Sequence, residues 1–97
     1  MMKKIFNHSE AFSINLGCIT KYEQLKLKES RVAIAGLGGV GGLYLINCVR
    51  MGIEKFNLAE FDQFELGNFN RQVGANMDSI GKNKLDAMIE QALAINP

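Results

Sequence analysis

Apolar and turn-forming residues alternate along the middle of this chain in a pattern that predicts a strand followed by a helix. Val32 and Ile34, with alanines between and after them, form a short apolar run, which predicts a strand covered on both faces. The stretch 43–51 is apolar on nearly every side, and Gly52 follows it. We therefore expect a buried helix that ends on a left-handed glycine.

The same pattern adds a second strand and a long loop. Phe56, Leu58 and Phe61 predict the strand. Residues 31–61 then form a strand-helix-strand unit of about thirty residues, the usual size of a right-handed crossover between parallel strands. Residues 62–80 hold many polar side chains and neither periodicity. They predict a long functional loop.

Helices are predicted on both sides of this unit. From Gly81, apolar residues recur at steps of three and four and predict an amphipathic helix that ends at residues 96–97. Its apolar positions are Leu85, Met88, Ile89 and Ala92. A capping box at residues 20–23 predicts a helix to about Lys28, and the stretch 9–16 predicts one or two further helical turns.

Composition limits how much machinery the chain can hold. Its 97 residues, 47% hydrophobic and 22% charged, fit at most one small domain with a thin core. The formal net charge is +1, with no basic stripe and no acidic tail. Charge therefore gives no argument for a nucleic acid or a membrane as partner.

Targeting and metal-binding signals are weak. The opening MMKKIF is far short of the apolar stretch of a signal peptide, and the longest nearly apolar run, 32–46, is too short and glycine-rich to span a bilayer. We therefore expect a cytoplasmic protein. Cys18, Cys48 and His8 show no metal-ligand spacing, so we expect two reduced thiols and neither a zinc site nor a disulfide.

A glycine motif joins the first strand to the helix after it. Gly36, Gly38 and Gly41 follow the pattern G-x-G-x-x-G, in which glycine permits a tight turn and lets backbone N–H groups approach a phosphate. Glu60 ends the second strand, where a carboxylate can accept hydrogen bonds from ribose hydroxyls. NAD, FAD and ATP all fit these features, whereas a P-loop is disfavoured because no Gly-Lys-Ser/Thr closes the turn.

Polar and cationic residues in the following loop favour a triphosphate. The candidates are Asp62, Asn68, Arg71, Gln72 and Lys84. A reacting triphosphate benefits from fixed cations at its oxygens, and Arg71 and Lys84 can supply them. Asn68 and Gln72 could equally satisfy backbone groups of the loop, and Asp62 is as well explained as a turn residue.

At this point the sequence resembles a known family, the ThiF/MoeB/HesA-type adenylyltransferases, which include the ubiquitin-activating enzymes. The matching segments are RVAIAGLGGVGG, EFD, FELGNFNRQ, IGKNK and INP, and the resemblance runs from Phe12 to Pro97. It implies an α/β, Rossmann-like three-layer fold with a parallel sheet. It also implies binding of ATP with Mg²⁺ and adenylation of the C-terminal carboxylate of a ubiquitin-like or sulfur-carrier protein. A homodimer is expected, and the open sheet edges of so short a domain favour self-association as well.

The resemblance also assigns roles to individual residues. Four glycines, at positions 36, 38, 39 and 41 (Gly36, Gly38, Gly39 and Gly41), would line the phosphate turn, and Glu60 would hold the ribose. Asn68, Arg71 and Gln72 occupy the N-x-x-R-Q positions near the phosphates. Lys84 takes the place of the phosphate-contacting lysine, which makes Arg71 and Lys84 the expected catalytic cations.

Two positions depart from the family pattern. Glu60 stands where the family usually has aspartate, and its longer side chain can still reach a ribose. Ile14 stands where an arginine normally reaches the phosphates, often from the partner subunit. Since isoleucine donates no hydrogen bond, another cation must substitute or catalysis is weakened.

The expected domain organisation is a helical segment at residues 1–30 followed by the N-terminal part of a ThiF-type ATP-binding domain at residues 31–97. The resemblance puts the magnesium ligand, any catalytic cysteine and the carrier-docking surface downstream of this chain, so the fold is expected to be incomplete here. Two alternatives stay open. One is a non-catalytic relative that binds a nucleotide or a partner, and the other is an NAD(P)- or FAD-binding oxidoreductase domain.

Overall fold

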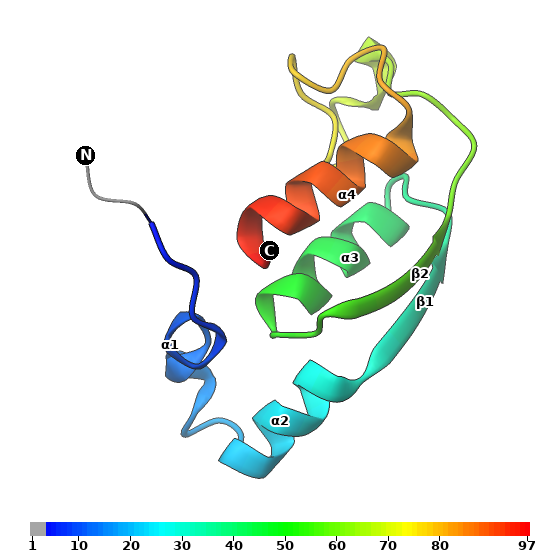
Figure 1. The fold of residues 1–97 in the computed structure, drawn as a ribbon. Coiled ribbons are helices and arrows are strands. Elements are labelled where there is room, and N and C mark those ends of the chain that lie inside the picture. Colours follow the sequence, from blue (N-terminus) through cyan, green and yellow to red (C-terminus); the bar gives the residue numbers. More distant parts are fainter. Residues whose placement is uncertain (1–3) are drawn as a thin grey trace.

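A computed structural model describes residues 4–97 and shows a short parallel sheet with helices on one face (Figure 1). The helices are α1 (His8–Ala11), α2 (Lys21–Glu29), α3 (Gly41–Arg50) and α4 (Lys84–Ile95), and the strands are β1 (Arg31–Ala35) and β2 (Lys55–Ala59). Single 3-10 turns lie at Ser13–Asn15 and Leu66–Asn68. The predicted segment 1–30 begins at three residues, 1–3, that lie outside the described part of the chain.

The capping signals read from the sequence are confirmed. The Thr20 hydroxyl accepts the N–H of Glu23, and the Glu23 carboxylate accepts the N–H of Thr20, which starts α2. Gly52 follows α3 with φ 96° and closes that helix, as expected. Helix α4 begins three residues after Gly81, and the side chain of Asn83 caps its N-terminus.

The two strands run parallel, with Val32 opposite Phe56 and Ile34 opposite Leu58. These four side chains share one face of the sheet, and α3 and α4 pack against that face (Figure 1). The predicted strand-helix-strand unit is therefore confirmed. Because parallel strands end at the same edge of a sheet, the glycine motif after β1 and Glu60 after β2 lie side by side.

Two expectations about burial and one about the extent of the second strand are wrong. β1 is covered on one face only, since Ala33 and Ala35 point to the opposite face and are exposed. α3 is also buried on one face only, and Tyr44 on its other side is 58% exposed. Phe61 lies outside β2 and is 93% exposed. The described residues form the sheet and one helical layer, and no helix among them covers the second face of the sheet.

The core is small and lies between the sheet, α3 and α4. Phe64, Leu37, Leu45, Met88 and Val49 are its fully buried side chains. Ile34 and Ala87 complete the cluster, and Leu85 and Ala92 pack against it. The apolar stripe of the last helix therefore serves as core, with Ile89 at its exposed margin.

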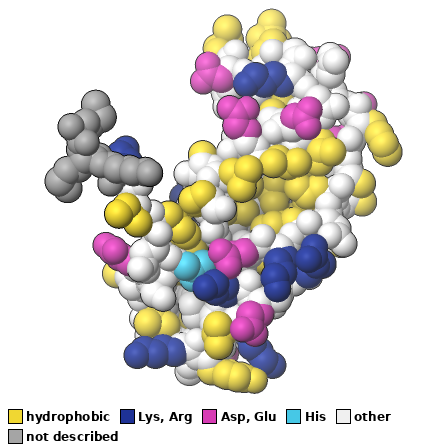
Figure 2. Space-filling model, viewed as in Figure 1, with side chains coloured by type: hydrophobic (Ala, Val, Ile, Leu, Met, Phe, Trp, Pro, Cys, Tyr) yellow, Lys and Arg dark blue, Asp and Glu magenta, His cyan; other side chains and the backbone are white. Residues whose placement is uncertain are grey.

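Both strands have one unpaired edge, since the described sheet contains only β1 and β2. A groove of about 350 Å³ follows the β2 side; its lining residues are Leu45, Glu54, Phe56, Leu58, Leu85, Ile89, Ala92 and Leu93. A second groove, of about 390 Å³, follows β1 and the outer side of α3. Figure 2 shows hydrophobic side chains gathered over α3 and α4 on the viewed face. The unpaired edges of β1 and β2 are templates on which another strand can pair, so self-association stays a prediction.

The N-terminal segment docks on the end of α3 that lies farthest from the glycine motif (Figure 1). The His8 ring nitrogen Nε2 lies 2.9 Å from the carbonyl oxygen of Gly52, and Gln24 donates to the carbonyl of Met51 at 2.9 Å. Phe12 is buried beside His8. These contacts satisfy carbonyls that a helix C-terminus leaves unpaired, and they place the segment about 15 Å from the glycine motif, one helix length away.

No helix among residues 4–97 has both the length and the apolar character that crossing a membrane requires.

Candidate nucleotide site

The glycine motif forms a tight turn between β1 and α3. Gly36 adopts φ 87° and donates its N–H to the carbonyl of Ala59 at 2.7 Å, which extends the pairing of the two strands by one residue. Leu37 then enters the core, where it is 0% exposed. A Cβ on Gly41 would overlap the carbonyl oxygen of Gly36, and one on Gly42 would lie 2.9 Å from the carbonyl of Leu37. The turn is therefore built for glycine at these positions.

The start of α3 presents free hydrogen-bond donors. Among residues 4–97, no acceptor pairs with the backbone N–H of Gly38, Gly39 or Gly41, and no side chain caps this helix. A Cβ on Gly39 would meet only the Arg71 carbonyl, at 3.8 Å, so the space over this residue is open. Free N–H groups and the positive end of a helix dipole together bind anions such as phosphate.

Glu60 lies beside this turn, and its carboxylate is engaged by backbone donors. Oε1 accepts the N–H of Leu37 at 2.7 Å. Oε2 accepts the N–H groups of Phe61 at 2.9 Å and Asp62 at 3.2 Å. The side chain that the sequence suggested as a ribose ligand therefore also joins the glycine turn to the end of β2.

These contacts change the acidity of Glu60. Burial by itself raises the pKa of the carboxyl group, because it disfavours the charged form. The three backbone N–H groups and the positive charge of Lys84 stabilise the carboxylate more strongly, so the pKa lies below its ordinary value of 4.5. Glu60 is therefore ionised near neutral pH.

A pH-dependent stability follows from this shift. Since the folded-state pKa of Glu60 lies below the unfolded value, its contribution is complete above about pH 4.5 and is lost as the pH falls through the folded pKa. We expect the urea midpoint of the native chain to fall below pH 4.5 more steeply than that of Glu60→Gln. The curves should be measured from about pH 3 to about pH 6, on both sides of the ordinary pKa of Glu60. Parallel curves for the two proteins would contradict the lowered pKa of Glu60.

Lys84 reaches the same region although it lies in the last helix. It is the first residue of α4 and is 7% exposed. Its backbone N–H donates to the carbonyl of Asp62 at 2.8 Å, and its ammonium lies 5.6 Å from the centre of the Phe64 ring. The positive charge of this ammonium contributes to lowering the pKa of Glu60. The antiparallel bridge between Gln63 and Asn83 closes the intervening loop and brings Lys84 to the sheet edge.

Gln72 supplies an unsatisfied amide at the turn. Its side chain is 7% exposed, and its Nε2 atom lies 3.5 Å from the position of a Cβ on Gly38. Its Oε1 atom is buried and has no hydrogen-bond partner among the described residues. Buried polar groups are normally paired; this oxygen lacks a donor, and the Nε2 group of the same amide is the atom that can donate to a phosphate.

Arg71 and Asn68 serve the loop in this structure. The exposed Arg71 guanidinium donates to the Gly67 carbonyl at 3.0 Å and to Asn70 Oδ1 at 3.1 Å. Asn68 accepts the N–H of Glu65 at 2.9 Å through its side chain. The side chain of Asp62 makes no hydrogen bond to another described residue, and only its backbone joins the site. The structure thus gathers the glycines, Glu60, Gln72 and Lys84, and it leaves Arg71 directed onto its own loop.

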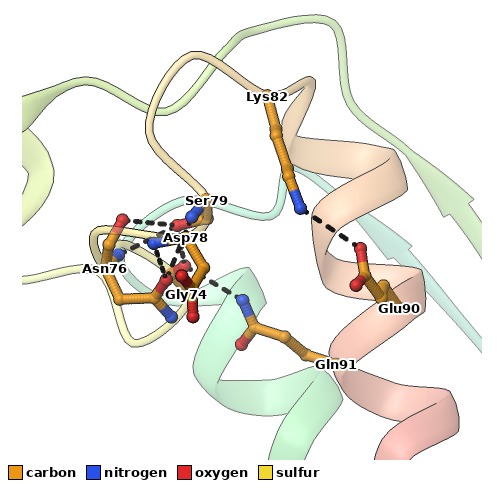
Figure 3. A network of polar contacts seen from close by, with 7 residues as sticks. All are labelled: Gly74, Asn76, Asp78, Ser79, Lys82, Glu90 and Gln91. Atoms are coloured by element: carbon orange, nitrogen blue, oxygen red, sulfur yellow. Dashed lines mark hydrogen bonds and ion pairs between the residues drawn. The ribbon is translucent and has the colours of Figure 1, made fainter.

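A second polar network holds the loop against α4 (Figure 3). The Ser79 hydroxyl donates to the Gly74 carbonyl at 2.6 Å, and Gln91 of α4 donates to the same carbonyl at 3.0 Å. The side chain of Asn76 accepts the N–H groups of Asp78 and Ser79. A Cβ on Gly74 would overlap the Met88 sulfur, so the backbone passes close over the core here.

This network was not foreseen from the sequence, although it fixes the loop two residues after Gln72. The signal that could have found it is the stretch Gly74-Ala75-Asn76-Met77-Asp78-Ser79, whose glycine, Asx and serine residues are typical of a folded loop. Exposed Lys82 and Glu90 add an ion pair with a 3.5 Å separation. Exposed pairs of this kind contribute little to stability.

The remaining candidates lie away from the turn. Ile14 is 90% exposed in the segment that packs on the far end of α3. Cys18 is exposed and Cys48 half-buried, and both are free thiols. Within residues 4–97 no group of three or more His, Cys, Asp or Glu side chains is placed to hold a metal ion.

Sequence comparison finds relatives that are similar to most or all of this chain. It is 32% identical, over 98 aligned residues, to the tRNA threonylcarbamoyladenosine dehydratase of Haemophilus influenzae, covering 100% of this chain and 37% of the relative. It is 37% identical over 82 residues to the ubiquitin-like modifier-activating enzyme 5 of Arabidopsis thaliana, covering 84% of this chain and 18% of the relative. The chain therefore spans well under half the length of these curated relatives.

Solved structures agree with the fold. The E. coli tRNA N6-threonylcarbamoyladenosine dehydratase TcdA in complex with ATP matches with a TM-score of 0.88 and 27% identity, over 92% of this chain and 37% of that one. E. coli MccB with ATP matches with a TM-score of 0.81 and 33% identity, over 89% of this chain and 27% of that one. The family model described as the ThiF family matches residues 11–97.

Proposed function

Because this chain belongs to the ThiF family, we propose that residues 31–97 form the ATP-binding part of an adenylyltransferase of the ubiquitin-activating type. The observation that carries the proposal is the meeting of three features at one sheet edge. These are the free N–H groups at the start of α3, the buried Gln72 amide beside Gly38 and the Lys84 ammonium. Related structures that hold ATP support the choice of ATP over NAD.

The residues present fit a nucleoside triphosphate. The glycine turn offers N–H donors with no side chain over Gly39, and the Nε2 group of Gln72, beside Gly38, can donate to a phosphate oxygen. Lys84 supplies a cation that is already positioned by the start of α4. Arg71 can leave its two weak loop acceptors for phosphate oxygens, because charge-assisted bonds to phosphate are stronger than bonds to neutral carbonyls.

The proposed reaction is the adenylation of a protein carboxylate. ATP supplies the α-phosphorus to which a carboxylate oxygen bonds while the bond to the bridging oxygen of the β-phosphate breaks, releasing pyrophosphate. Lys84 and Arg71 are assigned the task of stabilising the negative charge on the phosphate oxygens, a preorganised electrostatic role. The proposed partner is the C-terminus of a ubiquitin-like or sulfur-carrier protein, bound by a homodimer, and Mg²⁺ is the proposed metal.

Nucleotide binding is tested by isothermal titration of the chain with MgATP and, separately, with NAD. We expect MgATP to bind more tightly. Lys84→Met should weaken it by about ten- to a hundredfold, because a hydrogen bond to a charged group is lost. Arg71→Ala should weaken it less, since Arg71 first has to leave its loop.

The matched control is Lys82→Met, which removes the same charge two residues away, from an exposed ion pair directed at Glu90. It should leave MgATP binding within about twofold. Tighter binding of NAD, with no effect of Lys84→Met, would contradict the proposal and favour an oxidoreductase domain.

Ile14 favours a second candidate, a relative that binds ATP without reacting. Its apolar side chain is fully outside the site of its own chain, so an effect on catalysis would act through a second copy. ATP–pyrophosphate exchange in the presence of a carrier protein separates the two candidates. If the native chain binds ATP but shows no exchange, and if Ile14→Arg restores the exchange, the non-reacting form is supported.

A further inference from the structure

The Glu60 carboxylate joins two segments of chain at the nucleotide site. One of its oxygens is bonded to Leu37 in the glycine turn, at 2.7 Å, and the other to the two residues that follow β2. Leu37 and Glu60 are 23 positions apart in the sequence. A single side chain therefore sets the separation between the turn and the start of the following loop.

Leu37 is held from two directions as a result. Its side chain is completely buried in the core, and its backbone N–H is fixed by Glu60. The next residue is Gly38, the first with a free N–H at the start of α3. The position of these donors thus depends on how Leu37 is held.

Most acceptor positions of the Glu60 carboxylate are occupied by N–H groups of the protein. An ionised carboxylate offers about four lone-pair positions. Three are taken by backbone N–H groups, which leaves one on Oε1 for a sugar hydroxyl. A residue that acted only as a sugar ligand would keep more of its acceptors open.

We propose that Glu60 is a positioning residue for the phosphate turn, which it holds in register with the end of β2, in addition to any contact with a ribose. The inference rests on the proposed function, since it concerns how the same site holds phosphates. It makes Glu60 important for ligands that carry no sugar at all.

Electrostatics alone predicts the opposite sign. A carboxylate near a bound polyphosphate repels it, so removing the charge would strengthen binding if Glu60 acted only through its charge. The positioning role predicts weaker binding, because the N–H donors lose their fixed arrangement. The two effects can be separated with a sugar-free probe.

The experiment is isothermal titration of the full chain with inorganic tripolyphosphate and with MgATP. Glu60→Gln should weaken tripolyphosphate binding by about tenfold, the effect of losing one charged hydrogen bond. Glu60→Asp keeps the charge on a side chain one methylene shorter, so it should restore part of the affinity. Glu54→Gln, which removes an exposed carboxylate just before the opposite end of β2, should leave binding unchanged.

Amide hydrogen exchange separates positioning from a general loss of stability. In Glu60→Gln the N–H of Leu37 should exchange faster, while the amides of Leu45 and Val49 inside α3 keep their protection. Faster exchange at all three positions would overturn the inference, because Glu60 would then stabilise the fold as a whole.

The binding results distinguish the two proposals. Unchanged or tighter tripolyphosphate binding by Glu60→Gln, in a chain that binds MgATP, overturns the positioning role and leaves the proposed function standing. A native chain that binds neither MgATP nor tripolyphosphate overturns the proposed function, and the inference falls with it.

Discussion

Replacing Phe64 by alanine should remove about 3–5 kcal/mol from the free energy of unfolding, the largest effect expected of a single substitution here. Phe64 is 1% exposed and lies in the core with Leu37, Leu45 and Met88. Its backbone also closes the loop, since its N–H donates to the Lys82 carbonyl and its carbonyl accepts the N–H of Gly81. A small domain has about 5–15 kcal/mol of stability in total, so this variant should lose a large fraction of it.

The measurement is urea unfolding followed by circular dichroism, and the matched control is Phe61→Ala. Phe61 is the same residue type three positions earlier, but it is 93% exposed. It should change the free energy of unfolding by less than about 0.5 kcal/mol. Equal losses in the two variants would show that the loop from residue 61 onward does not pack as described.

The second large effect is expected at the glycine turn. In Gly41→Ala the new methyl group overlaps the Gly36 carbonyl, which belongs to the backbone and cannot move without opening the turn. The free N–H groups at the start of α3 then shift relative to one another. We expect MgATP affinity to fall by about a hundredfold, since displacements of about 1 Å at a ligand-binding constellation have effects of that order.

Two measurements are needed for this variant. Titration with MgATP reports the site, and urea unfolding reports the fold. Gly39→Ala is the control for stability, because its methyl group would meet only the Arg71 carbonyl at 3.8 Å. Its free energy of unfolding should stay within about 0.5 kcal/mol of the native chain. Native-like MgATP binding by Gly41→Ala would mean that the turn does not hold the phosphates.

The order of elements and their capping could be predicted because both depend on local chemistry. The βαβ unit follows from short apolar runs around a helical stretch, and Thr20 and Gly52 act on residues within a few positions of themselves. The ThiF resemblance also rests on short contiguous segments, and the family match confirms it. Glu60 could be placed at the end of β2 for the same reason.

Burial could not be predicted in the same way, because it depends on which elements pack together. Phe61 and Tyr44 read as apolar positions of a strand and a helix, and both are exposed, because no described element covers them. Conversely, the resemblance makes Lys84 a phosphate-contacting lysine, but nothing in the local pattern predicts that its side chain is only 7% exposed. Its burial comes from packing in the region of Phe64, whose ring centre lies 5.6 Å from the ammonium.

The sequence by itself determined the type of site: a glycine turn after a strand, a carboxylate after the next strand and a polar loop beyond it. Only the tertiary structure decided what each side chain does there. In the folded chain, Glu60 accepts a hydrogen bond from Leu37, and the side-chain oxygen of Gln72 has no partner among residues 4–97. Arg71 donates to its own loop. The physical reason is range. Turn and strand propensities act over a few residues, whereas the contact between Glu60 and Leu37 depends on the sheet bringing together residues 23 positions apart.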